Sequence, residues 1–258
     1  MPSSVPGLNA GAPRDFRTTR WSVVLAARNE DSRAQPALAE LCEIYWYPLY
    51  AFVRRQGHSS HDAQDLTQEF FARLLSRSWL EAVARERGRF RAWLLAAMKH
   101  FLAKEWNRAH AIKRGGGVRT VPIDEVMAES LYAEEPAEFA TAEKLYDRRW
   151  AMTLLDRARM RLRAEFERAG KLQQFEVLEG TLTGDATPYA ELAAKLESSE
   201  GAIKVAVHRL RARYRAELRA EVAQTVASEE QINVELRELL EALGGGDVTI
   251  SAKPVCKE

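Results

Sequence analysis

Apolar residues recur at three- and four-residue intervals along almost the whole chain, and this spacing limits the fold more than any other feature. Such a period places the apolar side chains on one face of an α-helix. The alternation of apolar and polar residues that is typical of strands is nearly absent. The chain is therefore predicted to be all-α. The predicted helical stretches are 35–55, 59–75, 89–112, 145–178, 188–196 and 199–218.

Proline and glycine divide this pattern into segments. Pro48 falls inside the first stretch and is expected to kink it or to divide it into two helices. The glycine triplet 115–117 ends another stretch, and two prolines with weak periodicity mark an acidic linker. The predicted arrangement is a disordered lead-in (1–16), a helical domain (17–117), the linker (118–144), a second helical domain (145–221) and an amphipathic C-terminal extension (222–258).

Composition excludes several classes of protein. Of the 258 residues 46% are hydrophobic, which is enough for a core and excludes a wholly disordered chain. The two cysteines, Cys42 and Cys256, lie too far apart for a disulfide scaffold or a cysteine-rich zinc module. No apolar run reaches the roughly 18 residues that span a bilayer, and the N-terminus lacks a signal pattern. We therefore expect a cytoplasmic protein without a membrane partner.

Charge is segregated along the chain although the formal net charge is only +1. Residues 85–119 contain ten basic and two acidic side chains, and residues 198–220 contain six and two. The acidic segments are 122–147 and 221–241. A polyanion responds to such local fields rather than to their sum. Nucleic-acid binding is one interpretation, and ordinary solvated helix faces are the other.

The segment TPYAELAAKLESSEGAIKVAVHRLRARYR has the pattern of a helix-turn-helix. A short helix from Pro188 to about Leu196 is followed by a three-residue break, and Ser199 can cap the second helix. The outer face of the second helix is basic and suits a major groove, with Lys204 and Arg209 nearest the bases. A helical hairpin with a solvated basic face is the alternative. The predicted DNA contacts are Ser199, Glu200, Lys204, His208, Arg209, Arg211 and Arg213.

The stretch 89–114 mixes basic and aromatic side chains, a combination that suits unpaired bases because rings stack on them and cations follow the backbone. Trp93 and Phe101 lie on the apolar stripe and are expected in the core. Trp106 is the better candidate for an exposed ring. The predicted contacts to melted DNA are Arg89, Arg91, Lys99, Lys104, Trp106, Asn107 and Arg108.

The helix predicted to start at Ser59 begins with an acidic ridge. His58, His61, Asp62 and Asp65 have a spacing that a metal site could use, but the helix dipole already explains acids in a first turn. We therefore predict no metal. Asp62, Asp65 and Glu69 instead suit a partner with basic helices. Since no glycine-rich nucleotide loop and no activated nucleophile occur either, we predict no cofactor and no enzymatic activity.

Three motifs in order resemble bacterial RNA polymerase sigma factors of the extracytoplasmic-function (ECF) type. DAQDLTQEFFARLL (62–75) resembles their acidic docking helix, FRAWLLAAMKHFLAKEWNR (90–108) their promoter-melting helix, and SEGAIKVAVHRLRARYR (199–215) their C-terminal helix-turn-helix. The resemblance covers about residues 17–221.

The resemblance implies a sigma factor that directs promoter recognition and transcription initiation without catalytic chemistry. Asp62, Asp65, Gln68 and Glu69 would dock on core RNA polymerase, the 90–114 helix would open promoter DNA, and the helix-turn-helix would read the minus-thirty-five element. An anti-sigma factor or a kinase would be the expected regulator. A stand-alone helix-turn-helix transcriptional regulator is the alternative.

The chain departs from this family at several positions. Glu197 stands where the turn usually has Gly, and a positive φ there would be strained. Val205 and Ala206 replace a common Ser-Arg pair. Gln64 and Thr67 make the docking helix less acidic, and a phosphate on Thr67 could restore its charge. The acidic extension is expected to pack on the basic domain, where it would mask Arg211–Arg219, or on a regulator.

Overall fold

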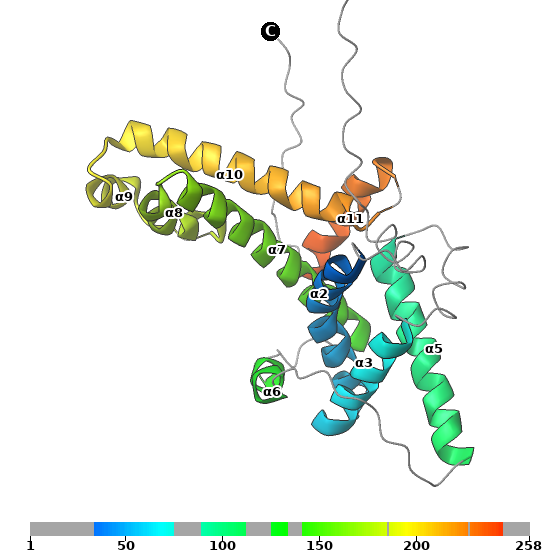
Figure 1. The fold of residues 1–258 in the computed structure, drawn as a ribbon. Helices are drawn as coiled ribbons and strands as arrows, with labels where there is room; N and C mark the ends of the chain where they lie inside the picture. The colour runs from blue at the N-terminus through cyan, green and yellow to red at the C-terminus, as the bar shows by residue number, and fades with distance from the viewer. Residues whose placement is uncertain are drawn as a thin grey trace, which may run out of the picture.

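The computed structural model describes residues 34–74, 89–111, 125–133, 141–184, 186–226 and 228–244. Every secondary-structure element in these ranges is a helix (Figure 1). The predicted lead-in (1–16) and the glycine triplet 115–117 lie outside them. The α-helices are α2 (Ala34–Arg55), α3 (Ser60–Leu74), α5 (Phe90–Ala111), α6 (Glu125–Ala133), α7 (Ala142–Arg168), α8 (Leu172–Leu178), α9 (Tyr189–Lys195), α10 (Glu200–Ala223) and α11 (Glu230–Ala242), and one 3₁₀ turn, η1, spans Glu179–Leu182.

Helix α2 runs without a break through Pro48, so of the two predicted outcomes, a kink or a division into two helices, the division is wrong. An internal proline costs about 3 kcal/mol. Against this cost, Tyr45, Leu49 and Phe52 are fully buried beside the proline, and burial of one large apolar side chain stabilises by roughly 1.5–3 kcal/mol. Packing of the helix therefore outweighs its local penalty.

Two hydrophobic cores form, and they do not follow the predicted domain boundary at 144/145. The larger core joins α2, α3 and α5 to α11, to the first half of α7 and to the last turns of α10. Tyr146, Trp150 and Leu154 of α7 are fully buried in it. The smaller core contains Leu162 at the far end of α7 together with side chains of α8, α9 and the first half of α10. Helices α7 and α10 therefore each contribute side chains to both cores (Figure 1).

The predicted linker 118–144 contains helix α6, which sequence analysis did not expect. Ala128 of α6 is buried in the larger core, and Glu129 binds Arg54 of α2. Arg149 of α7 donates a hydrogen bond to the carbonyl of Leu131. Sequence periodicity does not reveal α6, because the helix is only nine residues long and is stabilised by contacts with distant helices.

Helix α11 lies within the predicted C-terminal extension and packs against α7 and α10. Ile232 and Leu239 enter the larger core. Its acidic side chains meet Arg89 and Arg91 of α5 rather than the expected stretch Arg211–Arg219. Within that stretch, Arg219 donates a hydrogen bond to Asn233 of α11. None of the described helices is long and apolar enough to cross a bilayer.

Candidate nucleic-acid and protein interfaces

The acidic start of α3 is fixed by a local cap. Ser59 Oγ accepts the backbone N–H of Asp62 at 3.1 Å and donates to Asp62 Oδ2 at 2.7 Å. Asp62 and Asp65 are exposed, and Asp65 lies 3.1 Å from the Nδ1 of His61. Negative charge at the first turns of a helix is stabilised by the helix dipole. The cap and the dipole thus hold two carboxylates toward solvent, as a docking surface for a basic partner requires.

The other two predicted docking residues are not presented in the same way. Glu69 is half-buried and pairs with Arg73, whose second nitrogen binds Glu105 of α5 at 2.8 Å. Gln68 is buried. The structure therefore brings only Asp62 and Asp65 together on the open face of α3.

Thr67 is buried as well, which contradicts the hypothesis that a phosphate on Thr67 restores the charge of the docking helix. Its hydroxyl donates a 2.7 Å hydrogen bond to the carbonyl of Ala63, one turn earlier in α3. A kinase needs an accessible hydroxyl, and a phosphate at this position would place about two negative charges inside the larger core. The folded arrangement does not support phosphorylation at Thr67.

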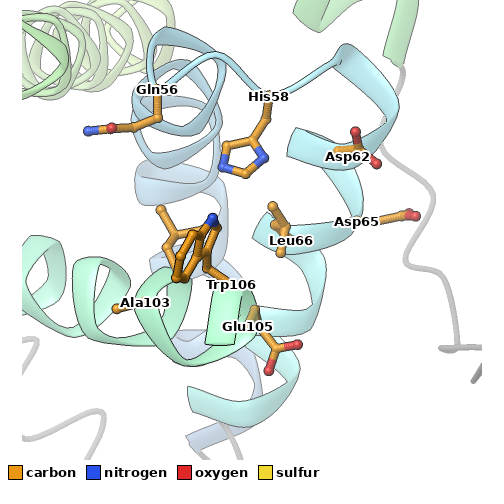
Figure 2. Close-up of a pocket in the computed structure, with 9 residues that line it drawn as sticks. Gln56, His58, Asp62, Asp65, Leu66, Ala103, Glu105 and Trp106 are labelled. Atoms are coloured by element: carbon orange, nitrogen blue, oxygen red, sulfur yellow. The ribbon is translucent and has the colours of Figure 1, made fainter. Parts of the chain in front are cut away.

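A groove of about 580 Å³ lies between α3 and the second half of α5 (Figure 2). Trp106 is 63% exposed and projects into the groove, beside Leu66 and below His58. The floor is apolar, whereas Asp62, Asp65 and Glu105 line the rim. The exposed ring confirms the assignment of Trp106 to the surface. Phe101 is buried as expected, whereas Trp93 is only partly buried against the larger core. An apolar surface edged by carboxylates is better suited to a protein than to a nucleic-acid backbone.

The cations of α5 fall into separate groups. Lys99 pairs with Glu143 of α7 at 2.7 Å. Lys104 and Asn107 are exposed near Trp106, and the side chain of Arg108 lies outside the described residues. The predicted melting residues therefore do not form one continuous basic surface.

Arg89 and Arg91 lie at the start of α5 in a cluster with three carboxylates, Asp147 of α7 and Glu235 and Glu238 of α11. We call this set the arginine–carboxylate cluster. Arg91 Nε lies 3.1 Å from Glu235 Oε1, its Nη2 lies 2.8 Å from Glu238 Oε2, and Asp147 binds its Nη1. Arg89 binds Glu238 and approaches Glu235 at 3.3 Å.

The side chain of Arg91 is only 7% exposed and that of Glu235 is fully buried. The predicted contact of Arg91 with DNA is therefore wrong for this arrangement, because the guanidinium is enclosed. Its plane also lies over the ring of Trp150, 4.5 Å from the centroid. Sequence analysis missed the three carboxylates, although the acidic runs 122–147 and 221–241 were the signal that they left.

The pKa values in the cluster shift as these contacts require. Burial alone would lower the pKa of Arg91, but the hydrogen bond to Glu235 and the charges of Asp147 and Glu235 raise it overall. The hydrogen bond from Arg89 lowers the pKa of Glu238. Burial raises the pKa of Asp147 despite the neighbouring Arg91. Two cations facing three carboxylates leave no positive charge for an external anion while the cluster is closed.

The helix pair α9–α10 has a tight turn. Ser199 Oγ accepts the N–H of Ala202 at 3.2 Å and caps α10. Glu197 has a φ of +48°, the one positive φ among the described non-glycine residues. The turn therefore keeps the left-handed conformation for which glycine is favoured. Leu192 of α9 packs with Ile203 and Val207 of α10 in the smaller core, which directs the opposite face of α10 outward.

The predicted DNA contacts of this helix divide into two groups. Glu200, Lys204, His208 and Arg209 are exposed on the first turns of α10. Arg211 instead donates two hydrogen bonds, 3.2 and 2.9 Å, to the carbonyl of Thr181, and Arg213 binds Glu165. Ser199 is used by the cap. Arg211 and Arg213 are exposed as well, but these contacts hold their guanidinium groups against the protein, so the first group is the candidate surface for DNA.

The described residues contain no cluster of His, Cys, Asp and Glu that could hold a metal ion. Cys42 is partly buried, and burial raises its pKa to about 11, so it is a poor nucleophile at neutral pH. The described residues offer three candidate binding surfaces: the acidic face of α3, the groove at Trp106 and the basic face of α10.

Residues 45–111 match the family model of sigma-70 region 2. This sigma-70 region 2 segment spans roughly a quarter of the chain and includes the second half of α2 and all of α3 and α5. It contains the acidic face of α3 and the groove at Trp106 but not the α9–α10 pair. No curated protein and no solved structure is significantly similar to the chain.

Proposed function

We propose that the chain is a sigma factor of the ECF type, which binds core RNA polymerase and directs it to promoters. The observation that carries the proposal is the sigma-70 region 2 match over 45–111. The exposed Asp62 and Asp65 within that segment suit the basic partner that a docking helix requires. Such a protein works by binding energy in the cytoplasm and carries out no catalytic step.

The proposed roles follow the exposed surfaces. Asp62 and Asp65 dock on the polymerase. Lys104 and Asn107 are the described α5 side chains that remain available to promoter DNA, while Trp106 serves the polymerase side of the same helix. Lys204, His208 and Arg209 of α10 enter a major groove. Each separated DNA step costs about 1.4 kcal/mol in stacking, so a few contacts are of the required size.

A stand-alone helix-turn-helix regulator is the alternative function, and the exposed basic face of α10 favours it equally. The two proposals differ in one respect. A sigma factor must bind core polymerase, whereas a stand-alone regulator needs only duplex DNA. The acidic face of α3 has a purpose in the first case and none in the second.

The experiment is run-off transcription from genomic fragments with purified core polymerase, accompanied by a binding assay with that polymerase. We expect specific transcripts only when the chain is present. The double variant Asp62→Asn/Asp65→Asn should weaken polymerase binding about 3- to 10-fold at low salt, since each exposed pair contributes roughly 0.2–1 kcal/mol. The matched control Glu167→Gln/Glu241→Gln removes two exposed carboxylates elsewhere and should bind normally. Absence of both transcripts and polymerase binding, with duplex binding retained, would establish the alternative.

A further inference from the structure

Helix α11 presents two carboxylates and an apolar stripe on the side that faces the rest of the molecule. Glu235 and Glu238 are three residues apart and therefore lie on one side of the helix. Both reach the arginines of α5. Ile232 and Leu239 flank them and enter the larger core. A single helix thus supplies both the charge and the apolar surface that close the start of α5.

The closed arrangement is reinforced by backbone contacts. The N–H of Phe90, between the two arginines, donates a 3.0 Å hydrogen bond to the carbonyl of Thr225, which follows α10. Tyr146 of α7 donates its hydroxyl to the carbonyl of Arg91 at 3.2 Å. The first turn of α5, which lies within the sigma-70 region 2 segment, is therefore held by residues far away in the sequence.

The balance of charge in the cluster depends on α11. With α11 in place, Arg89 and Arg91 face three carboxylates. Without α11 they would face Asp147 alone, and the start of α5 would carry an excess positive charge. Since a guanidinium binds phosphate as readily as carboxylate, the uncovered arginines would form an anion-binding surface.

We propose that α11 is an autoinhibitory element that competes with the phosphate groups of DNA for Arg89 and Arg91. The proposal rests on the proposed function in naming DNA as the anion. α11 is the element that can leave because it contains only 13 residues, a length that is marginal for an isolated helix, and because it is the last described helix of the chain.

The test compares two double variants of the full chain. Glu235→Gln/Glu238→Gln removes the charges that face the arginines. Glu230→Gln/Glu241→Gln is the matched control, because both carboxylates are exposed on the same helix and the net charge changes equally. Binding of the free chain to a short DNA duplex is measured by fluorescence anisotropy over a range of salt concentrations.

We expect the first variant to bind duplex about tenfold more tightly at low salt, with a salt dependence steeper by up to about two phosphate contacts. The control should change affinity less than about twofold. Adding Arg89→Gln to the first variant should remove most of the gain. Equal affinity of the two double variants, or a gain that survives Arg89→Gln, would overturn the proposal.

A second measurement tests the proposal if the double variant Glu235→Gln/Glu238→Gln folds poorly. The single variant Glu238→Gln keeps the buried pair of Arg91 with Glu235 and should show a smaller gain together with faster hydrogen exchange at the Phe90 amide. Unchanged exchange and unchanged affinity would also overturn the proposal. Neither readout requires polymerase. Failure of run-off transcription would therefore refute the sigma-factor function, whereas the duplex-binding data alone decide whether α11 competes with DNA.

Discussion

The guanidinium of Arg54 in α2 binds the carboxylate of Glu129 in α6 through two hydrogen bonds, Nε to Oε1 at 2.7 Å and Nη2 to Oε2 at 3.0 Å. Tyr50 donates its hydroxyl to the same carboxylate. Arg54 also lies over the ring of Tyr132, 4.7 Å from the centroid. One arginine therefore fixes α6 on α2 with both charge and aromatic contact.

This pair makes stability depend on pH. The hydrogen bond from Arg54 lowers the pKa of Glu129 below its ordinary value of 4.5. The contribution of this pair to the free energy of unfolding is therefore present above the pKa of Glu129 in the unfolded chain. It is lost as the pH falls through the lower pKa of Glu129 in the folded chain. In urea unfolding, wild type should exceed Glu129→Gln in stability at pH 7, and the difference should shrink between about pH 5 and pH 3. A difference that stays constant over this range would contradict the role of the pair.

The turn before α10 offers a stabilising substitution. Glu197 has a φ of +48°, which costs an L-residue about 1–2 kcal/mol. Glycine removes this strain but loses about 0.5–1 kcal/mol in backbone entropy. Glu197→Gly should therefore raise the free energy of unfolding by roughly 0.5–1 kcal/mol in thermal or urea unfolding. Glu200→Gly, the same change in the first turn of α10, is the control and should destabilise; a loss of stability in both would mean that the turn is not strained.

The basic face of α10 can be separated into binding and structural arginines. Lys204→Ala/Arg209→Ala should weaken duplex binding about tenfold at low salt and make its salt dependence shallower by about two phosphate contacts. Arg211→Ala should instead lower stability by about 1 kcal/mol or more, because the Thr181 carbonyl loses two hydrogen bonds, with little change in DNA affinity. The measurement is anisotropy with one duplex for all variants. A loss of affinity on Arg211→Ala equal to that of the double variant would show that the two groups act together.

Thr67 can be tested for its buried role. Thr67→Val keeps the shape of the side chain and removes one hydrogen bond, so we expect a change within about 1 kcal/mol. Thr67→Glu would bury an unpaired carboxylate and should destabilise by about 3 kcal/mol or more. Thermal unfolding of both variants checks this. A stable Thr67→Glu protein with stronger polymerase binding would restore the phosphorylation hypothesis.

The parts of the fold that the sequence predicts are those set by neighbouring residues. Ser59 and Ser199 cap α3 and α10 within three residues, and the break between α9 and α10 includes the predicted residues 197–199. The exposure of Trp106 also follows from its place off the apolar stripe. Local spacing is sufficient there because each partner lies on the same or the adjacent helix.

The features that sequence analysis missed depend on distant partners. Arg91 was assigned to DNA because a basic residue beside aromatic ones suits a phosphate, yet Glu235 lies 144 residues away and encloses it. Helix α6 depends on Arg54, 75 residues earlier. The continuity of α2 through Pro48 depends on burial against several helices. No periodicity in one stretch records such contacts, so charge segregation could indicate pairing but not the partner.

Helix α7 belongs to both cores, and at 27 residues it is about 40 Å long. Trp150 near one end and Leu162 toward the other anchor a single rigid rod. Heat or denaturant should consequently melt the two cores as one cooperative transition rather than two. A large partner that requires a greater distance between the two cores would have to separate the first half of α7 from α2. Helix α7 therefore fixes the distance between the two cores that such a partner can bind at the same time.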